Sequence, residues 1–391
     1  MTEVLKGVRV VELSTMITAP LAGMMLADLG AEVIKIENPQ GGDPFRSFRG
    51  GQYSPHFAAY NRGKRGVALD LRKAEGLEAL NKLLERADIL IENFRTGVMD
   101  RLGLTDDALK ALNSRLIHCS ITGFGTSGPY SARPAYDSVG LALSGISSLL
   151  LDPEHPQTCG PTIPDNATGM FACYGILGAL YEREKTGRGR RVELNMMEAA
   201  ISFMPDPFAN HTLMGIKNDP ITRVASSHSF AFRCADSKLL AVHLSSQTKF
   251  WEGMLTAIGR TDMAGDERFK TRDLRINNFL ELTRVLAEVF LKKPRSDWMT
   301  LLEAQDVPYA PIHNIPEVID DPQVKHLEVF RTLQHPTMGE QLTIRRPVRI
   351  DGGHDGSYIA APTLGQDTGS VLAELGYGEA EVEKLRTASV I

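Results

Sequence analysis

Short runs rich in Val, Ile and Leu alternate with helical segments along the first third of this chain. Residues 8–13 and 32–37 are two such runs, and residues 19–29 between them place Leu, Met and Ala at helical spacing. The same alternation continues through strand-like runs at 66–71, 89–92 and 116–122 and charged helical stretches at 74–87 and 105–113. This pattern predicts an α/β fold with a mostly parallel sheet flanked by helices.

The pattern of apolar residues changes after residue 160. Residues 167–180 are small and apolar and predict a buried helix, whereas a strand pair at 229–233 and 239–244 precedes helical segments that carry Trp251, Phe269 and Trp298. We predict a large domain over residues 1–195, a linker helix over 196–224, a small α+β domain over 225–325, and a C-terminal segment, 326–391, that returns to the large domain.

The composition excludes several classes of protein. The chain has 391 residues, with 43 Lys and Arg against 48 Asp and Glu, and its net charge of −5 argues against nucleic acid and anionic membranes as partners. No apolar stretch reaches the roughly 18 to 20 residues of a transmembrane helix. The N-terminus has no secretory signal pattern. We therefore expect a cytoplasmic protein without a membrane partner.

The sequence shows no pattern for a metal site or for NAD. The cysteines at 119, 159, 173 and 234 form no Cys-x-x-Cys pair, and the ten histidines form no cluster at metal-ligand spacing. Residues 13–23, where a dinucleotide enzyme carries Gly-x-Gly-x-x-Gly, have no such glycines, and Glu37 alone is weak support for ribose binding. Gly-x-Ser-x-Gly, Walker and His-Glu-x-x-His motifs are also absent. We expect buried or unreactive thiols, no metal and no NAD.

After these exclusions, Asp165 remains as the candidate catalytic residue. It directly precedes the predicted buried helix, so it is either the N-cap of that helix or a functional carboxylate. The two roles are compatible, because a helix N-terminus would hold the carboxylate ionised and its amides could stabilise an oxyanion. The glycine-rich segment 123–130, which follows a predicted strand, is either a plain turn or a loop that approaches a ligand closely.

Several motifs together resemble the family III CoA-transferases, the CaiB/BaiF group. They read Leu-Lys-Gly-Val-Arg-Val-Val-Glu-Leu at 5–13, Ala-Asp-Leu-Gly-Ala-Glu-Val-Ile-Lys-Ile-Glu at 27–37, Asn-Arg-Gly-Lys-Arg-Gly-Val-Ala-Leu-Asp at 61–70 and Glu-Asn-Phe-Arg at 92–95. Gly187-Arg-Gly and Asp367 extend the match over nearly the whole chain. The resemblance implies a Rossmann-like large domain completed by the C-terminal segment, a small domain, and a homodimer of two ring-like subunits threaded through one another.

The resemblance also implies a reaction and a binding site. Asp165 falls in the motif of the family's nucleophile, which attacks an acyl-CoA and carries an aspartyl anhydride and an aspartyl-CoA thioester in turn. Acyl-CoA and a small carboxylic acid would then be the substrates, and Arg72 and Arg101 the natural phosphate partners. The positions that would contact coenzyme A are Ile17, Thr18, Asn38, Leu69, Asp70, Leu71, Arg72, Asn93, Phe94, Arg95, Arg101, Tyr136 and Asp137.

Two departures from the formyl-CoA transferases bear on the substrate. Asn38 stands where those enzymes have arginine, and Ala-Ser-Ser-His-Ser at 225–229 replaces their glycine-rich loop over the active site. Oxalate is therefore not the acceptor that we expect. Ser226, Ser227 and His228, together with Arg233 and His243, could meet the far carboxylate of a dicarboxylic acid or could be ordinary structure of the small domain.

Two other functions remain as alternatives. The same fold hosts α-methylacyl-CoA racemases, which need a histidine and an aspartate to move a proton, but here Tyr136 replaces the histidine. Tyrosine is a poor base near neutral pH, so a transferase is favoured. A non-catalytic CoA-binding protein would keep the binding positions without Asp165.

Overall fold

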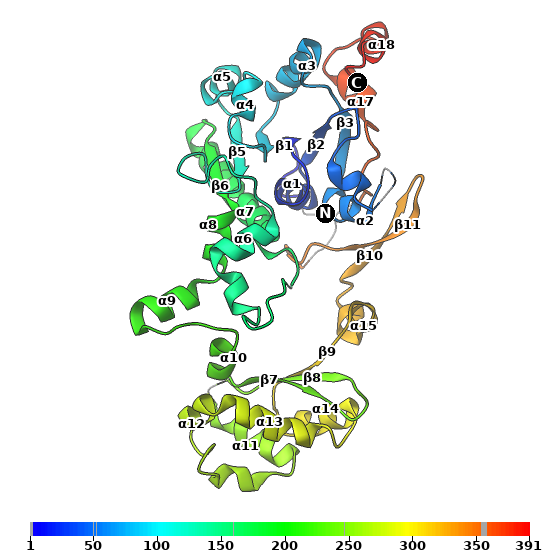
Figure 1. Ribbon diagram of the computed structural model, residues 1–391. Coiled ribbons are helices and arrows are strands. Elements are labelled where there is room, and N and C mark those ends of the chain that lie inside the picture. Colours follow the sequence, from blue (N-terminus) through cyan, green and yellow to red (C-terminus); the bar gives the residue numbers. More distant parts are fainter. Residues whose placement is uncertain (1–2, 50, 52, 159, 246, 353–357) are drawn as a thin grey trace. The chain divides into compact units, whose positions relative to one another are not determined.

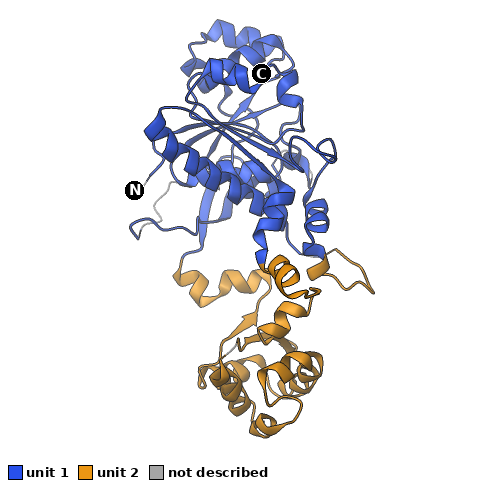
Figure 2. Ribbon diagram, turned by 90° about the vertical axis from the view of Figure 1, so that its left-hand side faces the viewer, with its two compact units in different colours: residues 1–147, 160–205, 328–391 blue, residues 148–159, 206–327 orange. Residues whose placement is uncertain are grey.

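The computed structural model describes residues 3–49, 51, 53–158, 160–245, 247–352 and 358–391. The chain forms two compact units, unit 1 with residues 1–147, 160–205 and 328–391, and unit 2 with residues 148–159 and 206–327 (Figure 2). Unit 1 is thus assembled from three separate stretches of chain. That the chain divides into domains near residues 195, 225 and 325 stays a prediction.

A six-stranded parallel sheet forms the centre of unit 1 (Figure 1). Its strand order, β3-β2-β1-β4-β5-β6, is that of a doubly wound Rossmann-type sheet, which confirms the predicted parallel α/β fold. The strands are β1 (Arg9–Leu13), β2 (Glu32–Glu37), β3 (Lys64–Ala68), β4 (Ile89–Glu92), β5 (Ile117–Thr122) and β6 (Arg191–Asn195).

Helices cover both faces of this sheet. On one face the buried side chains of the strands pack with those of α3 (Ala74–Leu84), α5 (Asp106–Leu112), α17 (Thr368–Glu374) and α18 (Glu379–Thr387). On the other face they pack with α1 (Thr18–Asp28) and α7 (Ile163–Thr186). Unit 1 also contains α2 (Pro55–Asn61), α4 (Val98–Arg101), α6 (Asp137–Ser144) and α8 (Met196–Phe203), with a 3-10 turn at Pro44–Ser47. A second 3-10 turn, Ile146–Leu149, spans the boundary at which the chain leaves unit 1.

Two parts of unit 1 differ from the predicted elements. The third strand ends at Ala68 instead of residue 71. The Leu69 N–H still donates to the Glu37 carbonyl at the end of β2, but the Asp70 N–H donates to Val390, outside the sheet. The Pro- and Gly-rich tail contains an unpredicted antiparallel hairpin, β10 (Phe330–His335) with β11 (Gly339–Ile344).

Unit 2 has its own core around the antiparallel sheet β7-β8-β9. The pair β7 (Ser229–Arg233) and β8 (Leu239–His243) agrees with the predicted strands, and β9 (Tyr309–Ile312) joins them. Phe232 stacks on Phe290, and Trp298 packs beside Phe290. Phe269 was predicted to lie in a helical segment, but it is buried in a turn. The helices are α9 (Pro205–Met214), α10 (Thr222–Ser226), α11 (Thr248–Ala257), α12 (Arg272–Asn277), α13 (Phe279–Phe290), α14 (Arg295–Glu303), α15 (Ile315–Asp320) and α16 (Pro322–His326), with a 3-10 turn at Thr261–Gly265.

In the described part of the chain, no helix combines the length and the apolar character that a membrane crossing requires.

Candidate active site

The predicted coenzyme A positions lie at one edge of the parallel sheet. Ile17 and Thr18 follow β1, Asn38 follows β2, and the segment from Leu69 to Arg72 follows β3. Asn93, Phe94, Arg95 and Arg101 follow β4, and Tyr136 and Asp137 lie beyond β5. The carboxyl ends of parallel strands meet at a common edge, and ligands of open α/β sheets bind in the crevice where the strand order reverses, here between β1 and β4.

Asn93 joins the two loops at this crevice. Its Oδ1 accepts a hydrogen bond from the Thr15 backbone N–H at 3.0 Å, and its Nδ2 donates to the Thr15 carbonyl at 2.8 Å and to Thr18 Oγ1 at 3.1 Å. The side-chain amide of Asn93 is thus used to hold the loop after β1. Asn93 was predicted to contact coenzyme A, and this structural role was not apparent from the sequence.

A buried network of charges supports the same loop. Lys35 Nζ lies 3.1 Å from Glu12 Oε1 and 3.0 Å from Asp43 Oδ2, and Asp43 Oδ1 accepts the Met16 N–H at 3.1 Å. This hydrogen bond holds Met16 at φ +68°, a left-handed conformation that only glycine adopts without strain. Lys64 Nζ reaches Glu12 at 2.8 Å.

This network of charges was not predicted, although the sequence contains a signal of it. Glu12 and Lys35 are charged residues in the middle of strands that a doubly wound sheet buries on both faces. Burial lowers the pKa of Lys64 to about 8, against the opposing effect of the neighbouring Glu12 carboxylate. Charges buried without water are stable only when they are paired, so the strands and the loop are tied together.

Three cations stand among the predicted contact residues. Arg72 Nε and Nη2 each donate to the Asp70 carboxylate at 2.8 Å, while most of the Arg72 side chain remains exposed. Within the described part of the chain, neither Arg95 nor Arg101 takes part in an ion pair, and both are exposed. These guanidinium groups are suited to phosphate oxygens, which they bind through paired hydrogen bonds.

Asp165 is not the N-cap of α7, which was one of the two roles that the sequence left open. Helix α7 begins two residues earlier, at Ile163, because Pro164 is well suited to the first turn of a helix, and the N-cap is Thr162, whose side chain makes no capping hydrogen bond. Asp165 is the third residue of the helix. Its backbone N–H is satisfied from outside, by Asp137 Oδ1 of α6 at 3.2 Å.

The ionisation of Asp165 also differs from the expectation. Burial, and after it the negative charge of Asp137, raise the pKa of Asp165 from 3.8 to about 7. This shift runs against the expectation that the helix N-terminus keeps the carboxylate ionised, because burial and the second carboxylate both favour the protonated form. Asp165 is a half-buried carboxyl that exchanges its proton near neutral pH.

The glycine-rich segment after β5 has a structural reason for two of its glycines. A Cβ on Gly123 would lie 2.3 Å from the Ala135 side chain, and Gly125 has φ +94°. The segment is therefore a tight turn that returns the chain to Ala135, beside the predicted Tyr136 and Asp137. Its approach to a ligand stays a prediction.

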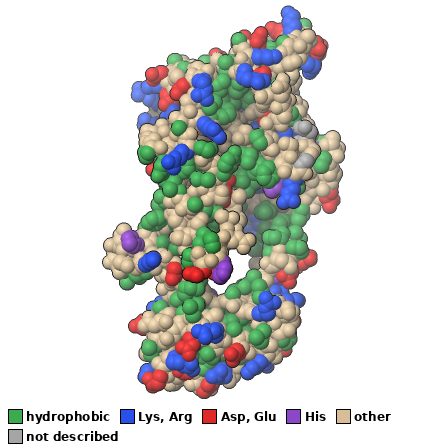
Figure 3. All heavy atoms as spheres, viewed as in Figure 1, with side chains coloured by type: hydrophobic (Ala, Val, Ile, Leu, Met, Phe, Trp, Pro, Cys, Tyr) green, Lys and Arg blue, Asp and Glu red, His purple; other side chains and the backbone are tan. Residues whose placement is uncertain are grey.

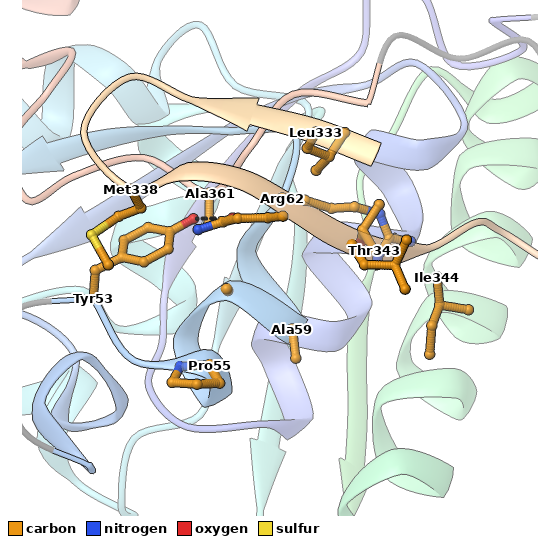
Figure 4. A pocket seen from close by; sticks show the side chains of 12 residues that line it. Tyr53, Pro55, Ala59, Arg62, Leu333, Met338, Thr343, Ile344 and Ala361 are labelled. Carbon is orange, nitrogen blue, oxygen red and sulfur yellow. Dashed lines mark hydrogen bonds between the residues drawn. The ribbon is translucent and has the colours of Figure 1, made fainter. Parts of the chain in front are cut away.

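Two cavities of unit 1 differ in their relation to these residues. One, of about 260 Å³, is lined by Phe94 and Arg95 together with His118, Ser120 and Arg191, so it lies directly behind the loop after β4. The other, of about 390 Å³, lies between α2 and the β10–β11 hairpin. Figure 4 shows Tyr53 and Met338 at one end of this second cavity and Ile344 at the other. None of the predicted site residues lines the second cavity.

The residues of segment 225–229 have structural partners inside unit 2. Ser227 Oγ accepts from Arg223 Nη1 at 2.7 Å and donates to the Arg223 carbonyl at 2.6 Å, and Ser226 Oγ donates to the Thr222 carbonyl at 2.9 Å. His228 is buried with a positive φ of 47°, and its Nδ1 lies 3.2 Å from the Ser245 carbonyl. A role of these residues in binding an acid stays a prediction, as it does for Arg233 and His243.

Within the described residues, no three or more His, Cys, Asp or Glu side chains are grouped so that they could hold a metal ion. Cys119, Cys173 and Cys234 are buried and unpaired, and burial raises the pKa of the Cys173 thiol to about 11. Cys159 lies outside the described residues.

Comparison with known proteins shows which family and which solved structures this chain resembles. Residues 5–368 match CoA-transferase family III. The chain is 31% identical to human succinyl-CoA:glutarate CoA-transferase over 99% of its length and 90% of that protein, and 32% identical to formyl-CoA:oxalate CoA-transferase of Streptomyces avermitilis over both whole lengths. The crystal structure of a CAIB/BAIF family protein from Brucella suis superposes with a TM-score of 0.84 at 31% identity, over 95% of this chain and 99% of that one.

Proposed function

Because this chain belongs to CoA-transferase family III, we propose that it moves CoA from an acyl-CoA to a carboxylic acid through covalent intermediates on Asp165. The observation that carries the proposal is the position of Asp165. It is a half-buried carboxyl in the first turn of α7, next to the Tyr136-Asp137 segment that follows the glycine-rich turn. A group that is partly shielded from water and changes its protonation near pH 7 can act as a nucleophile at that pH.

The proposed reaction has four balanced steps. The ionised Asp165 attacks the thioester carbonyl, the C–S bond breaks, and CoA leaves as a thiolate from an aspartyl mixed anhydride. The thiolate then attacks the aspartyl carbonyl and releases the donor acid, which leaves an aspartyl-CoA thioester. The acceptor carboxylate attacks this thioester and expels the thiolate again. Finally, the thiolate attacks the acceptor carbonyl of the new anhydride and frees Asp165.

Each step uses only carboxylate and thiolate nucleophiles, so the proposal requires neither a metal ion nor NAD. The coenzyme A contacts that we propose are the residues predicted above, at the carboxyl edge of the sheet. Arg72, Arg95 and Arg101 are the proposed phosphate partners, supported by their exposed guanidinium groups. Asn93 and Asp43 support this site indirectly, because they hold the loop that carries Ile17 and Thr18.

We further propose that the chain acts as an interlocked homodimer. Support comes from exposed apolar side chains on α7, of which Tyr174 is 76% exposed, Tyr181 68% and Met170 54%. Hydrophobic side chains are also frequent on the face of unit 1 that Figure 3 shows. Aromatic residues gathered on one long helix are typical of protein interfaces.

The substrates can be found by a matrix of donors and acceptors. Relatives of similar identity are named for dicarboxylic acids, as in succinyl-CoA:glutarate CoA-transferase, and for aromatic acids, as in the cinnamoyl-CoA:phenyllactate CoA-transferase of Clostridium sporogenes. We therefore propose screening both classes by mass spectrometry, with oxalate included as the acceptor that Asn38 and segment 225–229 disfavour. Failure of every pair to exchange CoA would contradict the proposed reaction.

Proton exchange separates the transferase from the racemase alternative. A racemase removes the α-proton of its substrate, whereas the anhydride route leaves that C–H bond intact. We expect a 2-methylacyl-CoA incubated with the enzyme in deuterated water to gain no deuterium at the α-carbon. Deuterium uptake without CoA transfer to any acid would favour the racemase, with Tyr136 replacing its histidine. The measurement is the mass of the recovered acyl-CoA.

A further inference from the structure

The first turn of α7 takes its cap from another helix. The Thr162 side chain makes no capping hydrogen bond, and the Asp165 N–H, one of the donors that a helix start leaves without a partner, is bound by Asp137 Oδ1 at 3.2 Å. Asp137 is the first residue of α6 and is 28 positions away in the sequence. A carboxylate on one helix therefore fixes the turn that carries the proposed nucleophile on another.

Close packing keeps this contact in place. Gly140 lies one turn after Asp137 on α6, and a Cβ there would come within 2.9 Å of the Pro164 side chain and 2.8 Å of Met196 Sδ. Only glycine allows α6 to approach the start of α7 so closely. This packing keeps the α6 backbone at Asp137 close to the first turn of α7.

Asp137 is the main influence among the charged groups around Asp165, second to burial itself. On the elements packed against α7, the other titratable groups have partners elsewhere: Asp28 of α1 binds Arg62, Glu198 of α8 binds Asn195, Arg191 and Glu193 of β6 bind each other, and His118 of β5 lies between Asp106 and Glu92. Asp137 is the one charged group that is identified as acting on the Asp165 carboxyl within the described residues. Its own pKa is raised by burial.

We propose that Asp137 is the positioning residue of the nucleophile, which orients Asp165 through the backbone of α7 and places a second carboxylate beside it. This inference rests on the proposed function, and it gives Asp137 a task beyond the predicted contact with coenzyme A. The consequence is chemical, because a carboxylate that binds its proton more tightly is also a stronger nucleophile once ionised. Asp137 thereby lowers the fraction of Asp165 that is ionised near neutral pH and makes the ionised form of Asp165 a stronger nucleophile.

The test separates the charge of Asp137 from its hydrogen bond. Asp137→Asn keeps an oxygen that can accept the Asp165 N–H and removes the charge, whereas Asp137→Ala removes both. We expect the acidic limb of the pH profile of kcat/KM to move down by about one pH unit in Asp137→Asn. Asp137→Ala should show the same shift together with a lower melting temperature. Asp107→Asn, which removes an exposed carboxylate from the first turn of α5, is the matched control and should leave the limb in place.

A second measurement makes the result independent of turnover. The Asp165 carboxyl carbon can be followed by NMR in protein labelled with 13C at the aspartate carboxyl group, with its signal assigned by its loss in Asp165→Asn. A lower titration midpoint in Asp137→Asn supports the inference even if no acid pair is converted, in which case the proposed function alone fails. An unchanged midpoint overturns the inference even if the enzyme is an active transferase.

Discussion

Asp165 combines a carboxyl group that can attack a thioester with a place in the first turn of a long helix, and substitution separates these two properties. Asp165→Asn retains the shape of the side chain and removes the negative charge. Because the structure assigns the capping hydrogen bond to Asp137, the variant should fold normally. We expect CoA transfer to fall by more than about a thousandfold, as for the loss of a covalent nucleophile.

The control for this prediction is a trap for the intermediate. Hydroxylamine added during turnover of the parent enzyme should convert the activated Asp165 to a hydroxamate, which peptide mass spectrometry detects. Asp165→Asn should give no such adduct. Transfer within tenfold of the parent rate, a barrier change of about 1.4 kcal/mol, would show that Asp165 is not the covalent nucleophile.

The raised pKa of Asp165 predicts a pH dependence of stability. Between the unfolded pKa of 3.8 and the folded value of about 7, the folded chain keeps a proton that the unfolded chain has lost. The parent therefore loses free energy of unfolding as the pH rises through this window, and a neutral Asn does not. We expect Asp165→Asn to equal the parent near pH 4 and to exceed it by up to about 4 kcal/mol above pH 7.

Urea unfolding at fixed protein concentration and at pH 4, 6 and 8 measures this difference. Fixed concentration matters because self-association adds its own free energy to the apparent stability. A difference between the two proteins that stays constant across the three pH values would contradict the raised pKa.

At the scale of the elements, α1 and α7 approach each other closely at Gly169. A Cβ at this position would lie 2.6 Å from the Thr18 carbonyl oxygen and 2.9 Å from the Leu21 Cβ. Gly169 follows Asp165 by one helical turn, and Thr18 starts α1 at the predicted coenzyme A site. The separation of the nucleophile and the loop after β1 therefore depends on a glycine.

Gly169→Ala tests this dependence. The added methyl group must push backbone atoms apart, so we expect a loss of about 1 to 3 kcal/mol in the free energy of unfolding and a loss of transfer activity. Gly369→Ala is the matched control, because a Cβ at this position of α17 meets no atom within 4 Å. The control should be neutral or more stable by up to about 1 kcal/mol, the helix propensity of Ala over Gly. Equal effects of the two substitutions in thermal unfolding would refute the packing argument.

At the scale of the whole molecule, unit 1 is built from three stretches of chain that lie far apart in sequence. Residues 328–391 belong to the same unit as residues 1–147, and the Asp367 carboxylate accepts the Gly66 N–H at 2.8 Å. The proposed interlocking of two such chains makes a strong prediction about assembly. Subunits that thread through each other can separate only if a large part of each chain unfolds.

We therefore expect dilution to leave the dimer intact. Sedimentation velocity with fluorescent protein at nanomolar concentration should show a single dimeric species. Two differently labelled preparations, mixed under native conditions, should exchange subunits no faster than the protein unfolds globally. A folded monomer at nanomolar concentration would contradict the interlocked assembly.

Much of the fold could be read from the sequence because its signals are local. The alternation of β-branched runs and helical segments predicted the strands at 32–37 and 89–92 with the observed bounds, since buried parallel strands require apolar residues at consecutive positions. The β10–β11 hairpin was missed because its strands are only partly buried and alternate weakly.

Some features of the candidate site also follow from local sequence signals, whereas others depend on residues that are distant in the sequence. Its residues could be named from the sequence because they occur in short motifs, and strand order brings the loops that carry them to one sheet edge. The capping of Asp165 by Asp137, the raised pKa of Asp165, the loop held by Asn93 and the buried Lys35-Asp43 pair depend on side chains 8 to 78 positions apart. The sequence by itself determined most of the elements and the carboxyl group available for chemistry, whereas only the tertiary structure decided its protonation. The physical reason is that burial and neighbouring charges, which set a pKa, exist only once distant segments pack together.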